Sequence, residues 1–331
     1  MGLRGSRFLA AVLLLFPQLS HANDSTAELA AGGIVLKQHA ALEMRSEDLF
    51  ISENEVRVSY RFFNPAASDT KVLVAFPMPD IEADGVDFMV AVPTENPENL
   101  LDFHTKVDGV EVTARVEQKA IKNGVDQTQR LRELGLPVQP HLSPTSEALD
   151  RLPKATQAEL LKSQLAVEND FDAGKGWEHH LAPTWTLQTT YFWEQIFPAG
   201  RELSVEHRYK PSVGQSAETS ISLSSVKGSY ARYCPDEQFM KAVRASTKGK
   251  GAGHFTEKRI SYILKSGANW AAPIGDFRLV IDKGEPNNLI SFCGDRVKKI
   301  SPTQFEIRRK NFRPDRDLHV LILTPLVIAN E

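Results

Sequence analysis

Thr184–Lys210 reads TWTLQTTYFWEQIFPAGRELSVEHRYK, and this stretch decides the fold. Its large side chains recur at every second position from Trp185 to Trp193, and again from Leu203 to Tyr209. A period of two is typical of strands that bury one face. Pro198-Ala199-Gly200, between the two runs, has the chemistry of a turn. We therefore expect a long antiparallel hairpin at the centre of a β-rich core.

The first 22 residues have the pattern of a secretory signal peptide. Arg4 and Arg7 precede an apolar run over 8–16, and Ser20-His21-Ala22 provides a small-x-small cleavage pattern. The apolar run is too short to cross a bilayer, which takes about 20 residues. We expect cleavage after Ala22 and a periplasmic or secreted protein. No transmembrane segment is expected in the mature chain.

Charge and cysteine content narrow the class of protein further. The 331 residues carry a formal net charge of −3, with acids and bases mixed along the chain. Such a balance gives no cationic surface for nucleic acid, so we expect no nucleic-acid partner. Cys234 and Cys293 are the two cysteines of the chain. An even pair in an exported protein favours one disulfide, with two buried thiols or a redox pair as the alternatives.

Strand patterns fill both ends of the chain, and helical patterns fill the middle. Alternating apolar runs separated by turn signals extend over 34–116, and Asp108-Gly109 is a strong hairpin signal. The last such run, 318–323, is apolar at both parities, as in a strand buried on both faces. The period becomes helical over 118–171, where Thr156 and Glu159 form a capping-box pattern. A further helix is expected over 235–245.

These patterns predict a mainly β fold with two antiparallel β-sandwich-like domains and a helical insertion. The boundaries we expect are a signal peptide at 1–22, an N-terminal β-sandwich at 23–117, a helical insertion and linker at 118–176, and a C-terminal β-rich domain at 177–331.

The segment after the expected cleavage site, NDSTAELAAGG over 23–33, resembles the opening of a family of exported bacterial proteins catalogued only as a domain of unknown function. The resemblance continues through 43–51, 72–80, 185–209 and 266–277, so it covers nearly the whole mature chain. It implies no particular activity, because the family has none assigned.

A second stretch resembles the von Willebrand-associated module that precedes inter-α-trypsin inhibitor-type domains. Its pieces are Phe63-Asn64-Pro65, the F-P-x-P of 76–79, 107–112, and the charged helical stretch from Glu117. This resemblance implies a β-sandwich used in extracellular contacts. The D-x-S-x-S motif of a complete adhesion architecture does not follow.

His207, with Glu206 and the pair His179-His180, forms the histidine grouping nearest the central stretch. Zinc needs three or four converging ligands, and adjacent strand residues point to opposite faces, so we assign no metal site. His207 shares its parity with Leu203 and Tyr209, which favours a hydrogen-bonded histidine in the core or at its rim. The sequence has no G-x-S-x-G motif, and we assign no catalytic residue.

Two other groups of residues are candidates for ligand contact. Trp177 and Trp270 stand beside small or polar residues and are the better candidates for an exposed aromatic platform, whereas the parity of Trp185 and Trp193 places those two in the core. Acidic side chains that could bind calcium cluster over 69–87, although without an EF-hand pattern: Asp69, Asp80, Glu82, Asp84 and Asp87.

The function expected from the sequence is that of an exported, non-enzymatic binding protein or cell-envelope accessory protein. It would hold an envelope protein or a glycan in a groove near Trp177, Trp270 and the insertion helices, with no cofactor. One alternative is an envelope hydrolase assembled around His207 and loop carboxylates. The other is a calcium-stabilised structural module.

Overall fold

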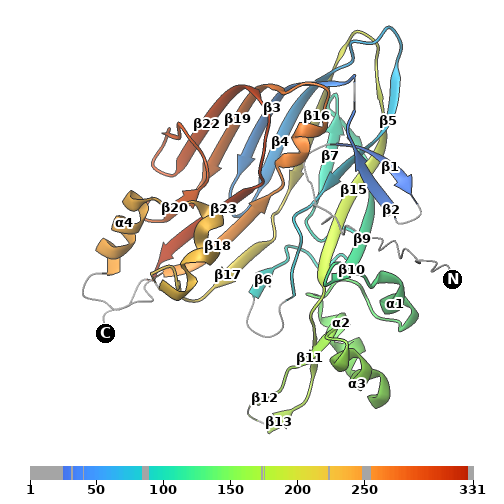
Figure 1. Cartoon of the computed structure of the whole chain (residues 1–331), viewed down its shortest axis with the longest axis vertical. Helices are drawn as coiled ribbons and strands as arrows, with labels where there is room; N and C mark the ends of the chain where they lie inside the picture. Colours follow the sequence, from blue (N-terminus) through green and yellow to red (C-terminus); the bar gives the residue numbers. More distant parts are fainter. Residues whose placement is uncertain are drawn as a thin grey trace, which may run out of the picture.

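The computed structural model describes residues 25–30, 33–39, 41–83, 89–172, 174, 176–222, 224–247 and 255–326. The expected signal peptide and two of the five candidate calcium ligands, Asp84 and Asp87, lie outside these residues. Strands dominate the described part of the chain, as predicted, and most of them belong to three sheets of eight, six and five strands (Figure 1).

The eight-stranded sheet has the strand order β21-β22-β19-β3-β4-β16-β7-β8. Its neighbours are antiparallel except for β3 and β19, which pair in parallel. The predicted Asp108-Gly109 turn joins β7 to β8, and both turn residues have positive φ. The strands are β3 (Glu43–Ile51), β4 (Val56–Phe63), β7 (His104–Val107), β8 (Val110–Val112), β16 (Glu202–Tyr209), β19 (Ile274–Asp282), β21 (Lys298–Lys299) and β22 (Gln304–Phe312).

The six-stranded sheet packs against the β4–β16 region of the eight-stranded sheet, in the order β10-β9-β15-β5-β1-β2. Phe76 of β5 and Trp193 of β15 both contact the ring of His207 on β16, with centroids 4.8 Å and 5.4 Å away. The strands are β1 (Ser25–Ala30), β2 (Gly33–Lys37), β5 (Thr70–Pro77), β9 (Arg115–Lys122), β10 (Val125–Asp126) and β15 (Thr186–Phe197).

The five-stranded sheet has the order β20-β23-β18-β17-β6 and is covered on both faces. Val320 and Ile322 of β23 belong to the main core, whereas Leu321 and Leu323 belong to a second apolar cluster. The prediction of a strand buried on both faces at 318–323 is therefore confirmed. The strands are β6 (Met89–Ala91), β17 (Val213–Ser216), β18 (Phe255–Tyr262), β20 (Leu289–Phe292) and β23 (Leu318–Pro325).

A helical layer covers the outer face of the five-stranded sheet. It consists of the 3₁₀ helix η1 (Ser224–Tyr233) and helix α4 (Glu237–Thr247), close to the helix predicted over 235–245. Tyr230, Tyr233, Phe239 and Val243 of this layer pack with Phe255 of β18 in the second cluster. This sheet is therefore a middle layer between the helices and the main core.

The expected central hairpin is wrong, although its two strands are right. β15 pairs with β5 and β9, whereas β16 pairs with β4 and β7, so Pro198-Ala199-Gly200 carries the chain from one sheet to the other. The chain changes sheets in the same way between β4 and β5, at Asn64. The two corners are joined, because Asn64 donates from Nδ2 to the carbonyl of Phe197 (2.9 Å) and accepts from the Gly200 amide (2.9 Å).

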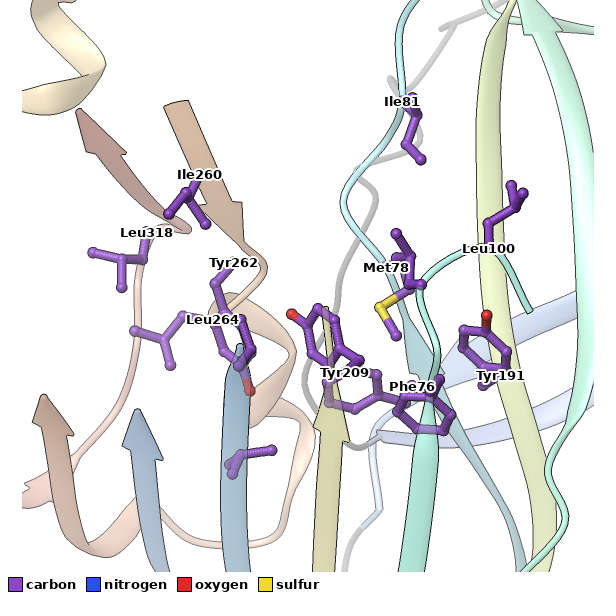
Figure 2. Packing of buried hydrophobic residues seen from close by; sticks show 14 of the residues in the cluster. Phe76, Met78, Ile81, Leu100, Tyr191, Tyr209, Ile260, Tyr262, Leu264 and Leu318 are labelled. Atoms are coloured by element: carbon purple, nitrogen blue, oxygen red, sulfur yellow. The ribbon is translucent and has the colours of Figure 1, made fainter. Parts of the chain in front are cut away.

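A continuous core joins all three sheets. Figure 2 shows Tyr209 of β16 between Tyr262 of β18 on one side and Met78 and Phe76 on the other. Each large sheet also combines strands from before residue 118 with strands from after residue 176. The expected division into sandwiches at 23–117 and 177–331 therefore does not follow the sheets, because their strands are interleaved.

The helical insertion covers one end of the six-stranded sheet (Figure 1). Trp185 enters it from the sheet and donates from Nε1 to the carbonyl of Val138 (2.8 Å). Helix α3 begins at Lys154 after Pro153, so the expected capping box at Thr156 lies inside the helix instead of at its start. The elements are α1 (Thr128–Glu133), α2 (Ser143–Asp150), α3 (Lys154–Lys162), the paired strands β11 (Ala166–Glu168) and β14 (Leu181–Pro183), and the hairpin β12 (Phe171–Asp172) with β13 (Trp177–Glu178).

Candidate functional site

Trp270 is fully buried, which corrects its assignment to an exposed platform. It follows the 3₁₀ helix η2 (Lys265–Asn269), and its ring lies 4.6 Å from that of Phe62 and 6.3 Å from that of Phe197. The loop-like sequence around Trp270 turns into the core instead of out to solvent. Trp270 is a packing residue and does not reach a ligand.

Trp177, by contrast, is 72% exposed. It lies on the β12–β13 hairpin, which projects from the insertion at the end of the molecule (Figure 1). The neighbouring Phe171 stacks on His180, with ring centroids 4.9 Å apart. Because Trp177 is exposed and Trp270 is buried, the two tryptophans do not line a common groove.

His207 is 2% exposed and surrounded by aromatic rings. Its Nδ1 contacts the hydroxyl of Thr105, and the rings of Phe103 and Tyr60 lie 5.1 Å and 5.7 Å away. A substrate cannot reach a histidine in this position. The alternative of a hydrolase built around His207 is therefore wrong, and its parity with Leu203 and Tyr209 indicated the core position correctly.

Cys234 and Cys293 form a disulfide, with sulfur atoms 2.13 Å apart. Cys234 directly follows η1, and Cys293 directly follows β20. The bond therefore ties the outer helical layer to the edge of the five-stranded sheet.

A polar pocket of about 520 Å³ opens between the five-stranded sheet, η1 and the segment Pro79–Glu82 that follows β5; we call it the outer pocket. Alternation along β18 points Glu257, Arg259 and Ser261 toward the outer layer, and Ile260 and Tyr262 toward the core. The lining is Pro79, Asp80, Ile81, Glu82, Val90, Ser212, Gly214, Ser220, Ser229, Tyr230, Arg232, Tyr233, Arg259, Ser261, Tyr262, Ile263, Asp317 and His319.

A fully buried carboxylate, Glu257, organises one wall of the outer pocket. It accepts hydrogen bonds from the hydroxyls of Thr219 and Tyr230, and from Nε and Nη2 of Arg259. Burial lowers the pKa of Arg259, but the hydrogen bond and charge of Glu257 outweigh burial and raise this pKa above its ordinary value. The Arg259 guanidinium therefore stays charged and is fixed in orientation at the pocket surface.

A cross-strand pair, Ser261 and His319, lies beside this wall. Ser261 Oγ and His319 Nδ1 are 2.9 Å apart, and the two residues are direct partners in the β18–β23 register. Burial and then the charge of Arg232 lower the pKa of His319, against the opposing effect of Asp317. The imidazole is therefore neutral near pH 7 and able both to donate and to accept hydrogen bonds.

The opposing wall carries carboxylates and belongs to a different sheet. Ile81 exchanges backbone hydrogen bonds with Leu187 of β15 (3.0 Å and 2.8 Å), and Gln188 donates from Nε2 to Asp80 (3.0 Å). Asp80 and Glu82 are exposed on either side of Ile81. Sequence reasoning named both as calcium candidates, and the structure places both in the pocket wall.

The pocket residues of β18 were missed, although the sequence holds a partial signal. Glu257, Arg259 and Ser261 put three polar side chains on one parity of a strand, which is unusual for a face that is covered. No local pattern, however, links β18 to the Pro79–Glu82 segment.

Two other features are absent from the described residues. No three His, Cys, Asp or Glu side chains within them converge to hold a metal ion. None of the helices within these residues is long and apolar enough to cross a membrane.

Fold and pocket together define a mainly β protein with interleaved sheets and a polar surface pocket. The chain matches the family model described as Domain of unknown function (DUF4424) over residues 22–321, and it belongs to this family. The resemblance found in the sequence is thus confirmed, whereas the likeness to the von Willebrand-associated module is not shown.

No curated protein matches the chain significantly. Among solved structures, it is similar to a crystal structure from Legionella pneumophila described as that of a candidate nutrient-binding protein. The identity is 15% and the TM-score 0.43, over 92% of this chain and 70% of the other.

Proposed function

We propose that this chain is an exported, non-enzymatic binding protein that holds a small polar ligand in the outer pocket. The observation that carries the proposal is the buried Glu257, which presets Arg259 at the surface of a cavity of about 520 Å³. Small-molecule sites typically measure about 300–1,000 Å³ and use a few fixed polar groups for specificity. Hydroxyls, guanidiniums and carboxylates in this pocket suit a ligand with several hydrogen-bonding groups.

Export rests on two features of the chain. The first 22 residues have the pattern of a signal peptide, and the Cys234–Cys293 disulfide suits an oxidising compartment. We therefore assign the protein to the periplasm or the extracellular space.

Contact with an envelope protein or glycan is assigned to the projecting hairpin. Trp177 offers a large aromatic surface there at little cost in side-chain entropy. The outer pocket and the hairpin are separate elements, so ligand binding and partner contact are tested separately.

The test is ligand screening of the mature chain by thermal unfolding, with pools of sugars, amino acids, short peptides and nucleotides. A ligand at a concentration 100 times its Kd stabilises the folded state by roughly 2.7 kcal/mol, which raises Tm measurably. Ser229→Trp places a large ring at the exposed mouth of the pocket and should abolish the rise. Ser163→Trp, at the exposed residue that directly follows α3, is the matched control and should preserve it.

The same samples distinguish binding from catalysis. The ligand should be recovered unchanged by mass spectrometry after prolonged incubation. Turnover of the ligand, or covalent labelling of Ser261 by a fluorophosphonate, would show that the Ser261–His319 pair is catalytic and would overturn the non-enzymatic assignment.

A further inference from the structure

We propose that the ligand of the outer pocket is a small zwitterion, of the amino-acid or short-peptide class. Its carboxylate would lie against Arg232 and Arg259, and its ammonium group against Asp80 and Glu82. This inference rests on the proposed function, because it names the ligand of the same pocket.

The two arginines lie together on one side of the pocket. Arg232 is exposed on η1, and Arg259 is held on β18 by Glu257. Both line the pocket together with Tyr233: burial raises the pKa of this tyrosine, and the charges of Arg259 and Arg232 act against that rise. The buried Glu257 carboxylate neutralises the charge of Arg259, so Arg232 supplies the excess positive charge of this wall.

The two carboxylates come from the other side. Figure 2 shows Ile81, which separates Asp80 from Glu82 in the chain, standing across from Ile260 and Tyr262 of β18. The backbone pairing of Ile81 with Leu187 anchors this segment to the six-stranded sheet. The two arginines and the two carboxylates are thus carried by separate parts of the fold.

A third carboxylate, Asp317, lies near His319 but accepts a hydrogen bond from the backbone amide of Lys265 (3.1 Å). Asp317 is therefore held at the start of η2, and Asp80 and Glu82 are the other two carboxylates of the pocket lining.

This separation of charge selects among ligand classes. A guanidinium binds a carboxylate through two parallel hydrogen bonds, and carboxylates are natural acceptors for an ammonium group. A dianion would be repelled by Asp80 and Glu82, and a polyamine would be repelled by Arg232. An uncharged sugar carries no charge of its own, so it could form an ion pair with neither wall. A zwitterion satisfies both walls at once.

The experiment is calorimetric titration of the mature chain with a dipeptide pool, the same pool amidated at the C-terminus, the same pool acetylated at the N-terminus, and a sugar pool. The free dipeptides should bind, and each modification should weaken binding about tenfold or more, since each removes one charge-assisted contact.

Two variants assign each end of the ligand to its wall. Arg232→Ala should weaken binding of the free dipeptides about tenfold. In this variant, C-terminal amidation of the dipeptides should cause no further loss of affinity. Glu82→Gln should likewise weaken binding of the free dipeptides, and in this variant N-terminal acetylation should cause no further loss of affinity. Arg151→Ala and Glu147→Gln, an exposed ion pair at the C-terminal end of α2, are the matched controls and should leave all affinities unchanged.

The outcomes separate this inference from the proposed function. Uncharged ligands such as sugars could bind, and Ser229→Trp could abolish that binding, while dipeptides and amino acids do not bind. The proposed pocket function would then stand, and the assignment of a zwitterionic ligand would be wrong. If amidation and acetylation leave dipeptide affinity unchanged, the assignment of the two walls is wrong. If no pool binds, both proposals fall.

Discussion

The hydroxyl groups of Tyr60 on β4 and Tyr262 on β18 lie 3.1 Å apart, and both side chains are buried. The two residues are 202 positions apart in the sequence, and their contact joins the eight-stranded sheet to the five-stranded sheet across the core. Tyr262 also lines the outer pocket, so this contact supports the base of the proposed ligand site.

Replacing either tyrosine of this pair by phenylalanine should destabilise the protein. Tyr60→Phe and Tyr262→Phe each remove a buried hydrogen-bonding group, and we expect a loss of about 1–3 kcal/mol in the free energy of unfolding. Because the two hydroxyls interact, the double variant should be more stable than the sum of the single losses, by about 0.5 kcal/mol or more. Urea unfolding of the four proteins measures this coupling, and strictly additive losses would show that the hydroxyls do not interact.

The two candidate tryptophans should respond in opposite ways to truncation. Trp270→Ala leaves a cavity between Phe62 and Phe197, and we expect a loss of about 3–5 kcal/mol. Trp177→Ala removes an exposed side chain and should change the free energy of unfolding by less than about 0.5 kcal/mol. Contact with an envelope partner, measured by pull-down, should be lost in Trp177→Ala. Retained capture at wild-type level would remove this residue from the proposed interface.

The sequence predicted strands and their buried faces well, because alternation is a local property. Trp185, Leu187, Tyr191 and Trp193 are all buried, as their shared parity indicates. Pairing was harder to predict. A turn between two alternating runs usually makes a hairpin, but here the corner at Asn64 holds the Pro198-Ala199-Gly200 segment and sends β16 to another sheet. That choice depends on β4 and β5, more than a hundred residues earlier.

The candidate site was even less accessible to sequence reasoning. The sequence identified Asp80 and Glu82 as acidic loop residues, and it placed Trp270 in a loop. Neither assignment says which residues lie next to these side chains in the folded protein. The pocket forms where β18 of the five-stranded sheet meets the Pro79–Glu82 segment, which pairs with β15 of the six-stranded sheet. The polar residues on one parity of β18 could have marked an unusual strand from the sequence alone. No sequence pattern identified the residues that lie across the pocket from them.

The disulfide should stabilise both the fold and the pocket. It closes a loop with a sequence separation of 59 residues, which corresponds to about 4 kcal/mol in the chain-entropy model. It also holds the end of η1, where Tyr230, Arg232 and Tyr233 line the pocket. We expect the Cys234→Ser and Cys293→Ser double variant to unfold at a lower Tm and to bind the pocket ligand more weakly. Dithiothreitol should lower the Tm of the wild type but not that of the double variant; an equal effect on both proteins would contradict the assignment.

His180 should make the attachment of the projecting hairpin dependent on pH. Hydrogen bonds to Asp150 (2.7 Å) and then Glu178 (3.3 Å) raise the pKa of His180 above its ordinary value of 6.5. A raised pKa means that protonation favours the folded arrangement, so the stabilisation is complete below pH 6.5 and is lost as the pH rises through the folded-state pKa.

Hydrogen–deuterium exchange across 166–183 at about pH 5.5 and about pH 8.5, corrected for intrinsic rates, measures this effect. Protection should be higher at the lower pH, because the protonated ring bridges α2 and the hairpin. His180→Gln should remove the difference between the two conditions, whereas His179→Gln, at a ring that is 77% exposed, should retain it. Equal protection of the wild type at both pH values would show that the Asp150–His180 contact does not hold the hairpin.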